Sequence, residues 1–289
     1  MLQSLRSYRE FVAGLPDDVA KAIHLTVARL ASVREDEFVN KELFIPATHL
    51  LGGVSKLVRP ALVFIGAHMI GETPEKFVDL ALAAEMMHVS SLIHDDMIDG
   101  DRERRGLTAV HVMYGNDAAI LAGDALISRA ISLSAKYGEG VMSHISKAAM
   151  EMCAGELLDS ASQRSGKASS IERYKEIARL KSASLIAACC SAPAVYKNNG
   201  RSEAIFGFGK DIGMAFQIKD DVDECIEGNG MRTSNLISSI RAELLLGEEE
   251  ACLKAIEMNN EYVESAILKI RELGYAEMEK YAESIRIRG

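Results

Sequence analysis

Apolar residues recur every three or four positions along most of the sequence, with polar residues between them. This spacing places the apolar side chains on one face of an α-helix, whereas a strand would need alternation at every second position. No long run shows such alternation with β-branched residues. Gly, Asn and Pro interrupt the pattern and divide it into segments. It predicts helices over residues 17–37, 59–69, 74–99, 116–137, 140–163, 170–196 and 202–227, followed by several shorter helices.

The stretches between these helices are short, and none has the length or biased composition of an interdomain linker. The chain has 289 residues, 48% of them hydrophobic, which is enough to bury a substantial core. We therefore expect a single all-α domain, a helical bundle, over residues 1–289.

The charge and the cysteines restrict the partners and the location. The formal net charge of −9 argues against a nucleic-acid partner, because binding to a phosphate backbone needs a basic surface. The five cysteines include no Cys-x-x-Cys pair, which is typical of reduced thiols, and the N-terminal residues lack a secretory signal pattern. The longest uncharged run, residues 182–196, is too short to span a bilayer. We expect a cytoplasmic protein without a transmembrane segment.

Two acidic clusters stand out, and each follows an apolar, helix-periodic segment. The first is Leu-Ile-His-Asp-Asp-Met-Ile-Asp over residues 92–99, and the second is Phe-Gln-Ile-Lys-Asp-Asp-Val-Asp-Glu over residues 216–224. On a helix, acids four residues apart such as Asp95 and Asp99 lie one above the other. Carboxylates crowded on a half-buried face resist ionisation unless a cation lies among them. Oxygen-only ligands suit Mg²⁺, which shares its shell with water and substrate phosphates.

Cationic residues lie on both sides of the first cluster. Gly-Asp-Arg-Glu-Arg-Arg-Gly follows it at residues 100–106, and paired arginines hold phosphate oxygens in bidentate fashion. Upstream, Lys56 and Arg59 come after a Gly pair, as in a loop whose backbone approaches an anion. The structural alternatives are a solvated acidic helix face and a surface salt-bridge network. Taken together, the acidic and basic segments predict an enzyme that handles diphosphates.

Six ordered blocks of sequence carry a resemblance to a known family. They are the first acidic cluster, the Arg-Arg-Gly after it, Ala-Ile-Leu-Ala-Gly-Asp at 119–124, Gly-Glu-Leu-Leu-Asp at 155–159, Lys-Ser-Ala at 181–183, and the second acidic cluster. With these blocks, the chain from about residue 51 to residue 227 resembles the trans-type isoprenyl diphosphate synthases, which include farnesyl, geranylgeranyl and longer polyprenyl diphosphate synthases. The resemblance implies a homodimeric all-α bundle whose two acidic clusters face each other across a central cavity. It also implies Mg²⁺-dependent head-to-tail condensation of isopentenyl diphosphate with an allylic diphosphate.

The resemblance also assigns roles to individual residues. The Mg²⁺ ligands would be Asp95, Asp99 and Asp220, supported by Asp96 and Asp221; these five residues and Lys181 form the catalytic set. The allylic diphosphate would contact Arg104, Lys181 and Gln217. Isopentenyl diphosphate would bind to Lys56, Arg59, His88 and Arg105.

In this family, bulky aromatic residues just before the first acidic cluster stop growth at short products. Here the corresponding residues are Ser90 and Ser91, both small. We therefore expect a product of geranylgeranyl length or longer, with Met87 or a residue of a neighbouring helix setting the final stop. The alternative is that other bulky residues close the cavity earlier.

Two departures from the family pattern keep other functions open. Leu57 stands where the family usually has Arg, and after Gly228 only Arg232 could substitute for the family's lysine-bearing turns. These departures fit a weakly active subunit of a heteromeric synthase. In addition, Asn235, Ser239 and Glu243 match the metal motif of class I terpene cyclases. The predicted pocket for a second diphosphate favours the coupling enzyme over the cyclase.

Overall fold

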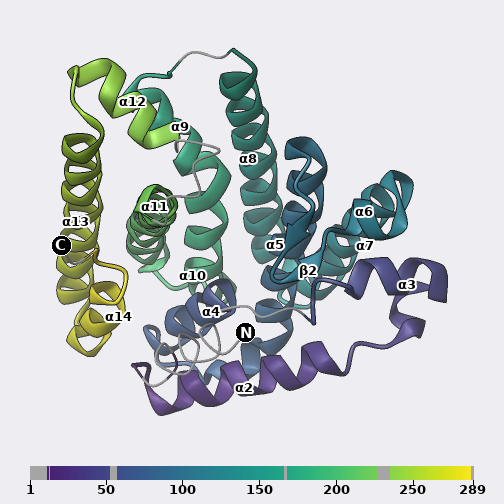
Figure 1. The fold of residues 1–289 in the computed structure, drawn as a ribbon. Helices are drawn as coiled ribbons and strands as arrows, with labels where there is room; N and C mark the ends of the chain where they lie inside the picture. The colour runs from purple at the N-terminus through teal and green to yellow at the C-terminus, as the bar shows by residue number, and fades with distance from the viewer. Residues whose placement is uncertain (1–11, 13, 53–56, 166–167, 227–234, 288–289) are drawn as a thin grey trace. The chain divides into compact units, whose positions relative to one another are not determined.

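The computed structural model describes residues 12, 14–52, 57–165, 168–226 and 235–287, without the Glu224 side chain. Regular structure in these ranges is helical apart from one short antiparallel hairpin. The elements, in chain order, are α2 (Asp17–Ala31), η1 (Glu35–Phe38), α3 (Lys41–Thr48), α4 (Val58–His68), η2 (Pro74–Phe77), α5 (Val78–Asp99), β1 (Glu103–Arg104), β2 (Leu107–Thr108), α6 (Val110–Tyr114), α7 (Asn116–Ala135), α8 (Gly138–Ser165), α9 (Ile171–Ala178), η3 (Arg179–Ala183), α10 (Ser184–Tyr196), α11 (Ser202–Ile226), α12 (Asn235–Leu244), α13 (Glu248–Leu273), η4 (Ala276–Met278) and α14 (Glu279–Glu283) (Figure 1). The predicted all-α fold is confirmed.

The chain divides into two compact units. One consists of Met1–Ser146 with Ala192–Asn199, and the other of Lys147–Ser191 with Gly200–Gly289. The single domain expected from the sequence stays a prediction.

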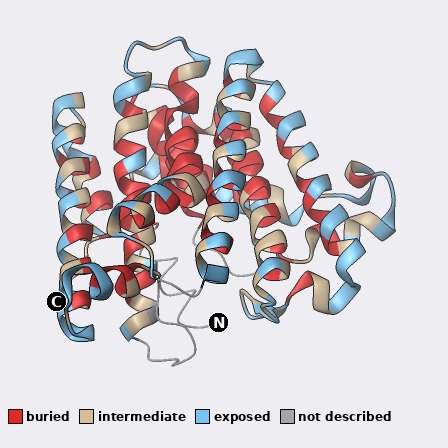
Figure 2. Ribbon diagram, turned by 90° about the horizontal axis from the view of Figure 1, so that it is seen from above, coloured by how far each residue is buried: buried red, intermediate tan, exposed pale blue. Residues whose placement is uncertain are grey.

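Helix α5 is the central helix of the first unit. Helices α4 and α7 pack against it, and every residue from Leu80 to Met87 is buried. A helix covered on several sides must be apolar around most of its circumference, which explains the nearly continuous apolar sequence before the acidic cluster. Figure 2 shows such buried runs in red. The helix ends at Asp99, where Gly100 takes the left-handed conformation with a φ of 71°. The first acidic cluster therefore lies at the end of a firmly packed helix.

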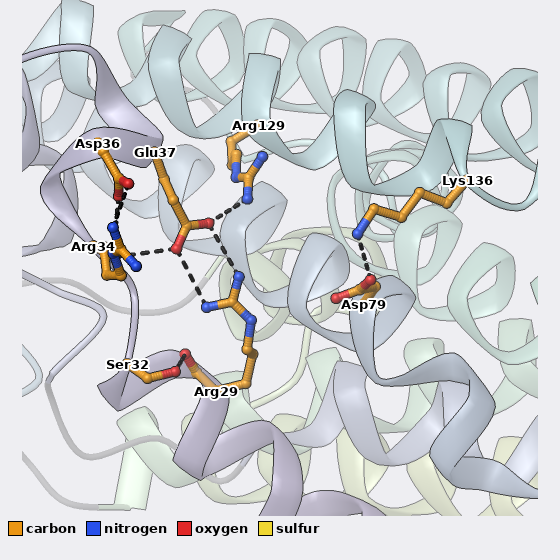
Figure 3. Close-up of polar contacts among 8 residues, drawn as sticks. All are labelled: Arg29, Ser32, Arg34, Asp36, Glu37, Asp79, Arg129 and Lys136. Carbon is orange, nitrogen blue, oxygen red and sulfur yellow. Dashed lines mark hydrogen bonds and ion pairs between the residues drawn. The ribbon is translucent and has the colours of Figure 1, made fainter.

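Glu37 of η1 joins three segments of the first unit (Figure 3). Its carboxylate accepts hydrogen bonds from Arg29 of α2, Arg129 of α7 and the backbone N–H of Arg34. Burial alone would raise the pKa of Glu37, but these hydrogen bonds hold it below its ordinary value. The predicted helix over residues 17–37 is therefore wrong in its last part, since α2 ends earlier and the chain turns before η1 to place this carboxylate between two arginines.

Helix α7 is tied to its neighbours by charged as well as apolar contacts. Lys136 directly after it binds Asp79 of α5 at 2.6 Å, and Arg129 binds Glu37 (Figure 3). By length and composition alone α7 could cross a membrane, although core helices of soluble proteins pass the same test. The expected absence of a transmembrane segment stays a prediction.

Helices α11 and α13 pack against each other in the second unit. Their buried core combines Met214, Ile218 and Val222 of α11, Leu236, Ile237 and Ile240 of α12, and Ala251, Ala255 and Met258 of α13. The prediction of several shorter helices in this region is confirmed for α12, η4 and α14 but wrong for α13, which runs unbroken from Glu248 to Leu273. No Gly or Pro interrupts that stretch, and the Glu250 carboxylate accepts a hydrogen bond from the Gly247 backbone N–H at 3.0 Å, which caps its start.

Candidate active site

The three aspartates at the end of α5 differ in exposure. Asp95 and Asp99 are partly exposed and lie four residues apart on one face of the helix. Asp96 is fully buried, and its Oδ1 accepts a hydrogen bond from Arg104 Nε at 2.6 Å and lies 2.5 Å from Arg104 Nη2 in an ion pair. Burial raises the pKa of Asp96, although the Arg104 guanidinium opposes that shift. Asp95 and Asp99 are thus accessible to a ligand, whereas Asp96 anchors an arginine.

The Arg-Arg-Gly sequence forms a tight hairpin turn. Arg104 of β1 pairs with Leu107 of β2, so Arg105 and Gly106 make the two-residue turn between them. Both turn residues have positive φ, 55° and 74°, as in a type I′ turn. The left-handed conformation is unfavourable for an Arg, and here an ion pair with Glu85 at 3.0 Å holds the Arg105 side chain in place.

The cations predicted for isopentenyl diphosphate gather around His88. The Arg105 and Glu85 side chains are only 10% and 3% exposed, and His88 follows Glu85 by one helical turn. Burial lowers the pKa of His88 well below its ordinary value, and the positive charges of Arg59, Arg105 and Arg104 lower it further. His88 is therefore neutral at pH 7, and its Nδ1 is buried without a hydrogen-bond partner among the described residues.

Glu85 is a site residue that sequence reasoning missed. It is the one acid in the buried stretch from Leu80 to Met87, and a buried acid needs a partner. That isolation was the available signal, and Arg105 proves to be a partner of Glu85.

Just before α4 this chain has Leu57 at the position where the family usually has an arginine. Lys56 lies outside the described residues. Leu57 caps α4 in the left-handed conformation, with a φ of 51°, and its side chain is buried. The residue that stands for the family's arginine is therefore a packing residue, and within the described part of the chain the positive charge near His88 comes from Arg59, Arg105 and Arg104.

Ser90 and Ser91, the predicted chain-length residues, occupy different environments. Ser90 and Met87 are each 1% exposed, so both belong to the core of the first unit. Ser91 is partly exposed, and its hydroxyl donates to the His88 carbonyl at 2.8 Å. Since Ser91 lies one turn before Asp95, it shares the accessible face of α5 with that aspartate.

The second acidic cluster, on α11, repeats the arrangement of the first. Asp220 is exposed, whereas Asp221 is buried and accepts a short hydrogen bond from the Tyr174 hydroxyl of α9. Burial raises the pKa of Tyr174 well above its ordinary value, and the charge of Asp221 adds to the shift. Gln217, one turn earlier, accepts a short hydrogen bond from the Ser182 hydroxyl. In each cluster an accessible aspartate is followed by a buried one. The buried aspartate is bound by a side chain of another segment, Arg104 for Asp96 and Tyr174 for Asp221.

Lys181 lies in a π-helical turn, η3, inside the predicted helix over residues 170–196. Its ammonium contacts two carboxylates of α8, Glu156 and Asp159, each at 2.8 Å. A side chain at Gly155 would overlap the Lys181 backbone nitrogen, so this glycine lets α8 approach η3 closely. π-Helical turns often occur at functional sites, and this one was not predicted.

A small cavity of about 50 Å³ lies beside Lys181 in the second unit. It is lined by Asp159, Ser169, Tyr174, Ile177, Ala178, Lys181, Gln217, Asp221 and Asn235. Three predicted site residues of this unit, Lys181, Gln217 and Asp221, thus share one cavity wall. That the two acidic clusters face each other across a larger cavity stays a prediction.

The accessible aspartates fit a hard divalent cation that is completed by a substrate. No group of three His, Cys, Asp or Glu side chains in the described part of the chain could hold a metal ion alone. Asp95, Asp99 and Asp220 supply carboxylate oxygens at accessible positions. Mg²⁺ is commonly bound by one or two carboxylates, water and substrate phosphates, and Asp95 with Asp99 on α5 fits such a donor set. A site that also includes Asp220 of the second unit stays a prediction.

Comparisons with known proteins agree with these features. The sequence model of the polyprenyl synthetase family matches residues 40–232. The short chain isoprenyl diphosphate synthase of Methanothermobacter thermautotrophicus is 32% identical over 83% of this chain and 74% of its own length. The geranylgeranyl pyrophosphate synthase of Geoglobus acetivorans is 34% identical over 74% of this chain and 67% of its own length.

A solved structure extends the likeness to the fold. The geranylgeranyl pyrophosphate synthetase of Pyrococcus horikoshii has a TM-score of 0.78 and 26% identity, and the likeness covers 98% of this chain and 100% of that one. The fold is thus that of the isoprenoid synthases. Since the family match spans more than half of the sequence, the chain belongs to the polyprenyl synthetase family and is a prenyltransferase.

Proposed function

We propose that this prenyltransferase couples isopentenyl diphosphate to an allylic diphosphate and extends it to geranylgeranyl length or beyond. The observation that carries the proposal is a second set of cationic groups apart from the accessible aspartates. The cations are Arg59 and Arg105, which lie near the neutral His88, and the buried Glu85 beside His88 is ion-paired with Arg105. A cyclase ionises a single diphosphate and does not need a pocket for a second one.

In the proposed reaction the C1–O bond of the allylic diphosphate breaks, and C1 bonds to the terminal alkene carbon of isopentenyl diphosphate. The coupled cation then loses a proton to the departing diphosphate, and inorganic diphosphate is the second product. Lys181 and Arg104 direct positive charge at the leaving oxygens, where negative charge develops in the transition state. Among the described residues Arg104 is bound through Nε to Asp96 and through Nη2 to Asp101, so Nη1 can donate to a phosphate.

Mg²⁺ bound by Asp95, Asp99 and Asp220 would neutralise further charge on the leaving diphosphate. The second diphosphate must be held without being ionised. Side-chain cations serve that purpose, since Arg59 and Arg105 attract phosphate oxygens and neutral His88 offers one N–H donor.

The release of inorganic diphosphate from geranyl or farnesyl diphosphate tests the proposal directly. At fixed Mg²⁺ we expect release only when isopentenyl diphosphate is also present. Release from the allylic substrate alone would support a cyclase. Inertness with both substrates, relieved by a partner protein, would support a subunit of a heteromeric synthase.

Arg59→Ala should raise the KM for isopentenyl diphosphate about ten- to a hundredfold with little change in kcat, since charge-assisted hydrogen bonds are worth about 1.5–3 kcal/mol. Arg59 is a cleaner probe than Arg105, whose loss would also remove the ion pair with the buried Glu85. Initial rates at varied isopentenyl diphosphate and saturating allylic substrate give both constants. Arg102→Ala, at an exposed position before β1, is the control. A rise in the KM for the allylic substrate instead would mean that the two pockets are inverted.

Ser91→Phe should shorten the product, because a bulky ring one turn before Asp95 would fill the space open to the growing chain on that face of α5. Ser90→Phe should instead lower the melting temperature, since Ser90 is buried and overpacking costs about 1–3 kcal/mol. Mass spectrometry of the products gives the chain lengths. Ser132→Phe, exposed on α7, is the control. An unchanged product distribution in Ser91→Phe would remove Ser91 from the tunnel wall.

The homodimer implied by the family has support in exposed apolar side chains on α6 and α7. Met113, Ile120 and Leu121 are 54%, 47% and 58% exposed. Large apolar side chains exposed on neighbouring helices often belong to protein interfaces. Leu121→Lys should therefore shift the protein toward monomers in light scattering after gel filtration. Leu253→Lys, at a position 57% exposed on α13, should leave the mass of the particle unchanged. A monomeric wild type would contradict the dimer.

We also propose a cytoplasmic location for this protein.

A further inference from the structure

The residues that match a cyclase metal motif have another use in this structure. Asn235, Ser239 and Glu243 are spaced four residues apart, so they form one stripe along α12. The proposed function leaves this stripe without a role. Ser239 and Glu243 contact residues at the start of α9, the helix that leads into η3. Asn235 contacts Asp159, a carboxylate that also binds Lys181.

Ser239 and Glu243 fix α12 to the start of α9. The Glu243 carboxylate accepts a hydrogen bond from the Ile171 backbone N–H at 2.7 Å, which caps the N-terminus of α9. The Ser239 hydroxyl donates to the Asn235 carbonyl at 2.7 Å and lies 3.0 Å from the Ser169 hydroxyl. Since a hydroxyl has one hydrogen, Ser169 is the donor to Ser239. The Glu243 carboxylate thus binds a backbone N–H of α9 in this structure and does not serve as a metal ligand.

Asn235 reaches the carboxylate that holds Lys181. Its Nδ2 donates to Asp159 Oδ1 at 2.7 Å, while Asp159 Oδ2 accepts from the Lys181 ammonium at 2.8 Å. The Asp159 side chain is only 10% exposed. Each oxygen of one buried carboxylate is therefore assigned to a different partner, and the carboxylate cannot rotate without breaking one of the two bonds.

This arrangement affects how the ammonium can act. The Lys181 ammonium lies between two carboxylates, Glu156 and Asp159. These carboxylates orient the ammonium, but they also compete with a phosphate for its hydrogen bonds. By occupying Oδ1, the Asn235 amide keeps Asp159 from turning both oxygens toward the ammonium. The neutral amide adds no charge, so Lys181 stays the one described cation in contact with this carboxylate.

We propose that Asn235 is a positioning residue that orients the Lys181 ammonium through Asp159, with Ser239 and Glu243 holding α12 in register. The proposal rests on the proposed contact of Lys181 with the allylic diphosphate. The stripe on α12 then contributes to the reaction through a side chain on η3, with no metal ligation by the stripe.

A double-mutant cycle separates this role from plain structural support. Asn235→Leu removes the amide at similar volume, and we expect roughly a tenfold lower kcat/KM for the allylic substrate, as for the loss of a hydrogen bond to a charged group. The KM for isopentenyl diphosphate should not change. In a Lys181→Met background, Asn235→Leu should cause no further loss, because the group it positions is gone. Equal losses in both backgrounds, or no loss in the wild-type background, would overturn the proposal.

Two further variants keep the result interpretable. Asn260→Leu, the same exchange at a partly buried position of α13, should leave all kinetic constants unchanged. If Asn235→Leu does not fold, Asn235→Gln decides by the same cycle, since it keeps the amide but displaces it by one methylene. Wild-type activity in Lys181→Met would refute the role of Lys181 itself, whereas additive losses would refute only the role of Asn235.

Discussion

Asp95→Asn is expected to lower kcat/KM for the coupling reaction by roughly three orders of magnitude, because metal charge stabilisation is worth several kcal/mol. Asp95 is one of two accessible carboxylates on the last turns of α5, and Asn keeps the shape but removes the charge that attracts Mg²⁺. The melting temperature should not fall, since removal of one acid from a crowded cluster relieves repulsion. Steady-state rates over a series of Mg²⁺ concentrations measure the loss.

Asp117→Asn is the matched control. Asp117 is an exposed acid in the first turn of α7, and the exchange removes the same charge from the same unit. Near-normal turnover of Asp95→Asn at saturating Mg²⁺ would show that Asp95 is not a metal ligand.

Lys181→Met should lower kcat by about a hundred- to a thousandfold, the usual effect of removing one group that stabilises transition-state charge. Met keeps most of the side-chain length and loses the ammonium between Glu156 and Asp159. The KM for isopentenyl diphosphate should stay close to its wild-type value, since that substrate is assigned to other cations. Single-turnover rates with the allylic substrate separate chemistry from product release.

Arg179→Met tests whether charge alone is responsible. Arg179 is exposed in the same π-helical turn, two residues from Lys181, so its loss removes an equal charge from η3. We expect nearly wild-type rates. Similar losses in the two variants would mean that Lys181 acts through the general field and not through a contact.

The sequence predicted the long helices before α12 well because their apolar periodicity is strong, whereas the long α13 was expected as shorter helices. Helix α11 was expected over residues 202–227 and runs from Ser202 to Ile226. The short elements were missed: α3, α6 and the β1–β2 hairpin are too short to show a period. The hairpin depends on a positive φ at Arg105, and an ion pair with a residue twenty positions earlier stabilises it. No local pattern shows such a contact.

The residue types of the candidate site were predictable, and the family resemblance already separated the expected ligands Asp95 and Asp220 from the supporting Asp96 and Asp221. The side chains that hold the supporting aspartates, Arg104 and Tyr174, were not predictable. Adjacent aspartates look alike in sequence, yet Asp96 and Asp221 are buried and anchored while Asp95 and Asp220 are accessible. Burial depends on which helices pack nearby, and that is tertiary information. The spacing of Asn235 left a cyclase metal motif open as an alternative, whereas the contact found in the structure is the Asp159 carboxylate.

Product analysis with purified protein tests the central claim most directly. Dimethylallyl, geranyl and farnesyl diphosphate are offered in turn with labelled isopentenyl diphosphate and Mg²⁺, and the products are dephosphorylated and separated by chain length. We predict that the label enters trans-prenyl chains of geranylgeranyl length or longer, with at least one of the starters. Growth that ends at farnesyl diphosphate would contradict the predicted length, and label that enters no prenyl chain with any starter would contradict the coupling function itself.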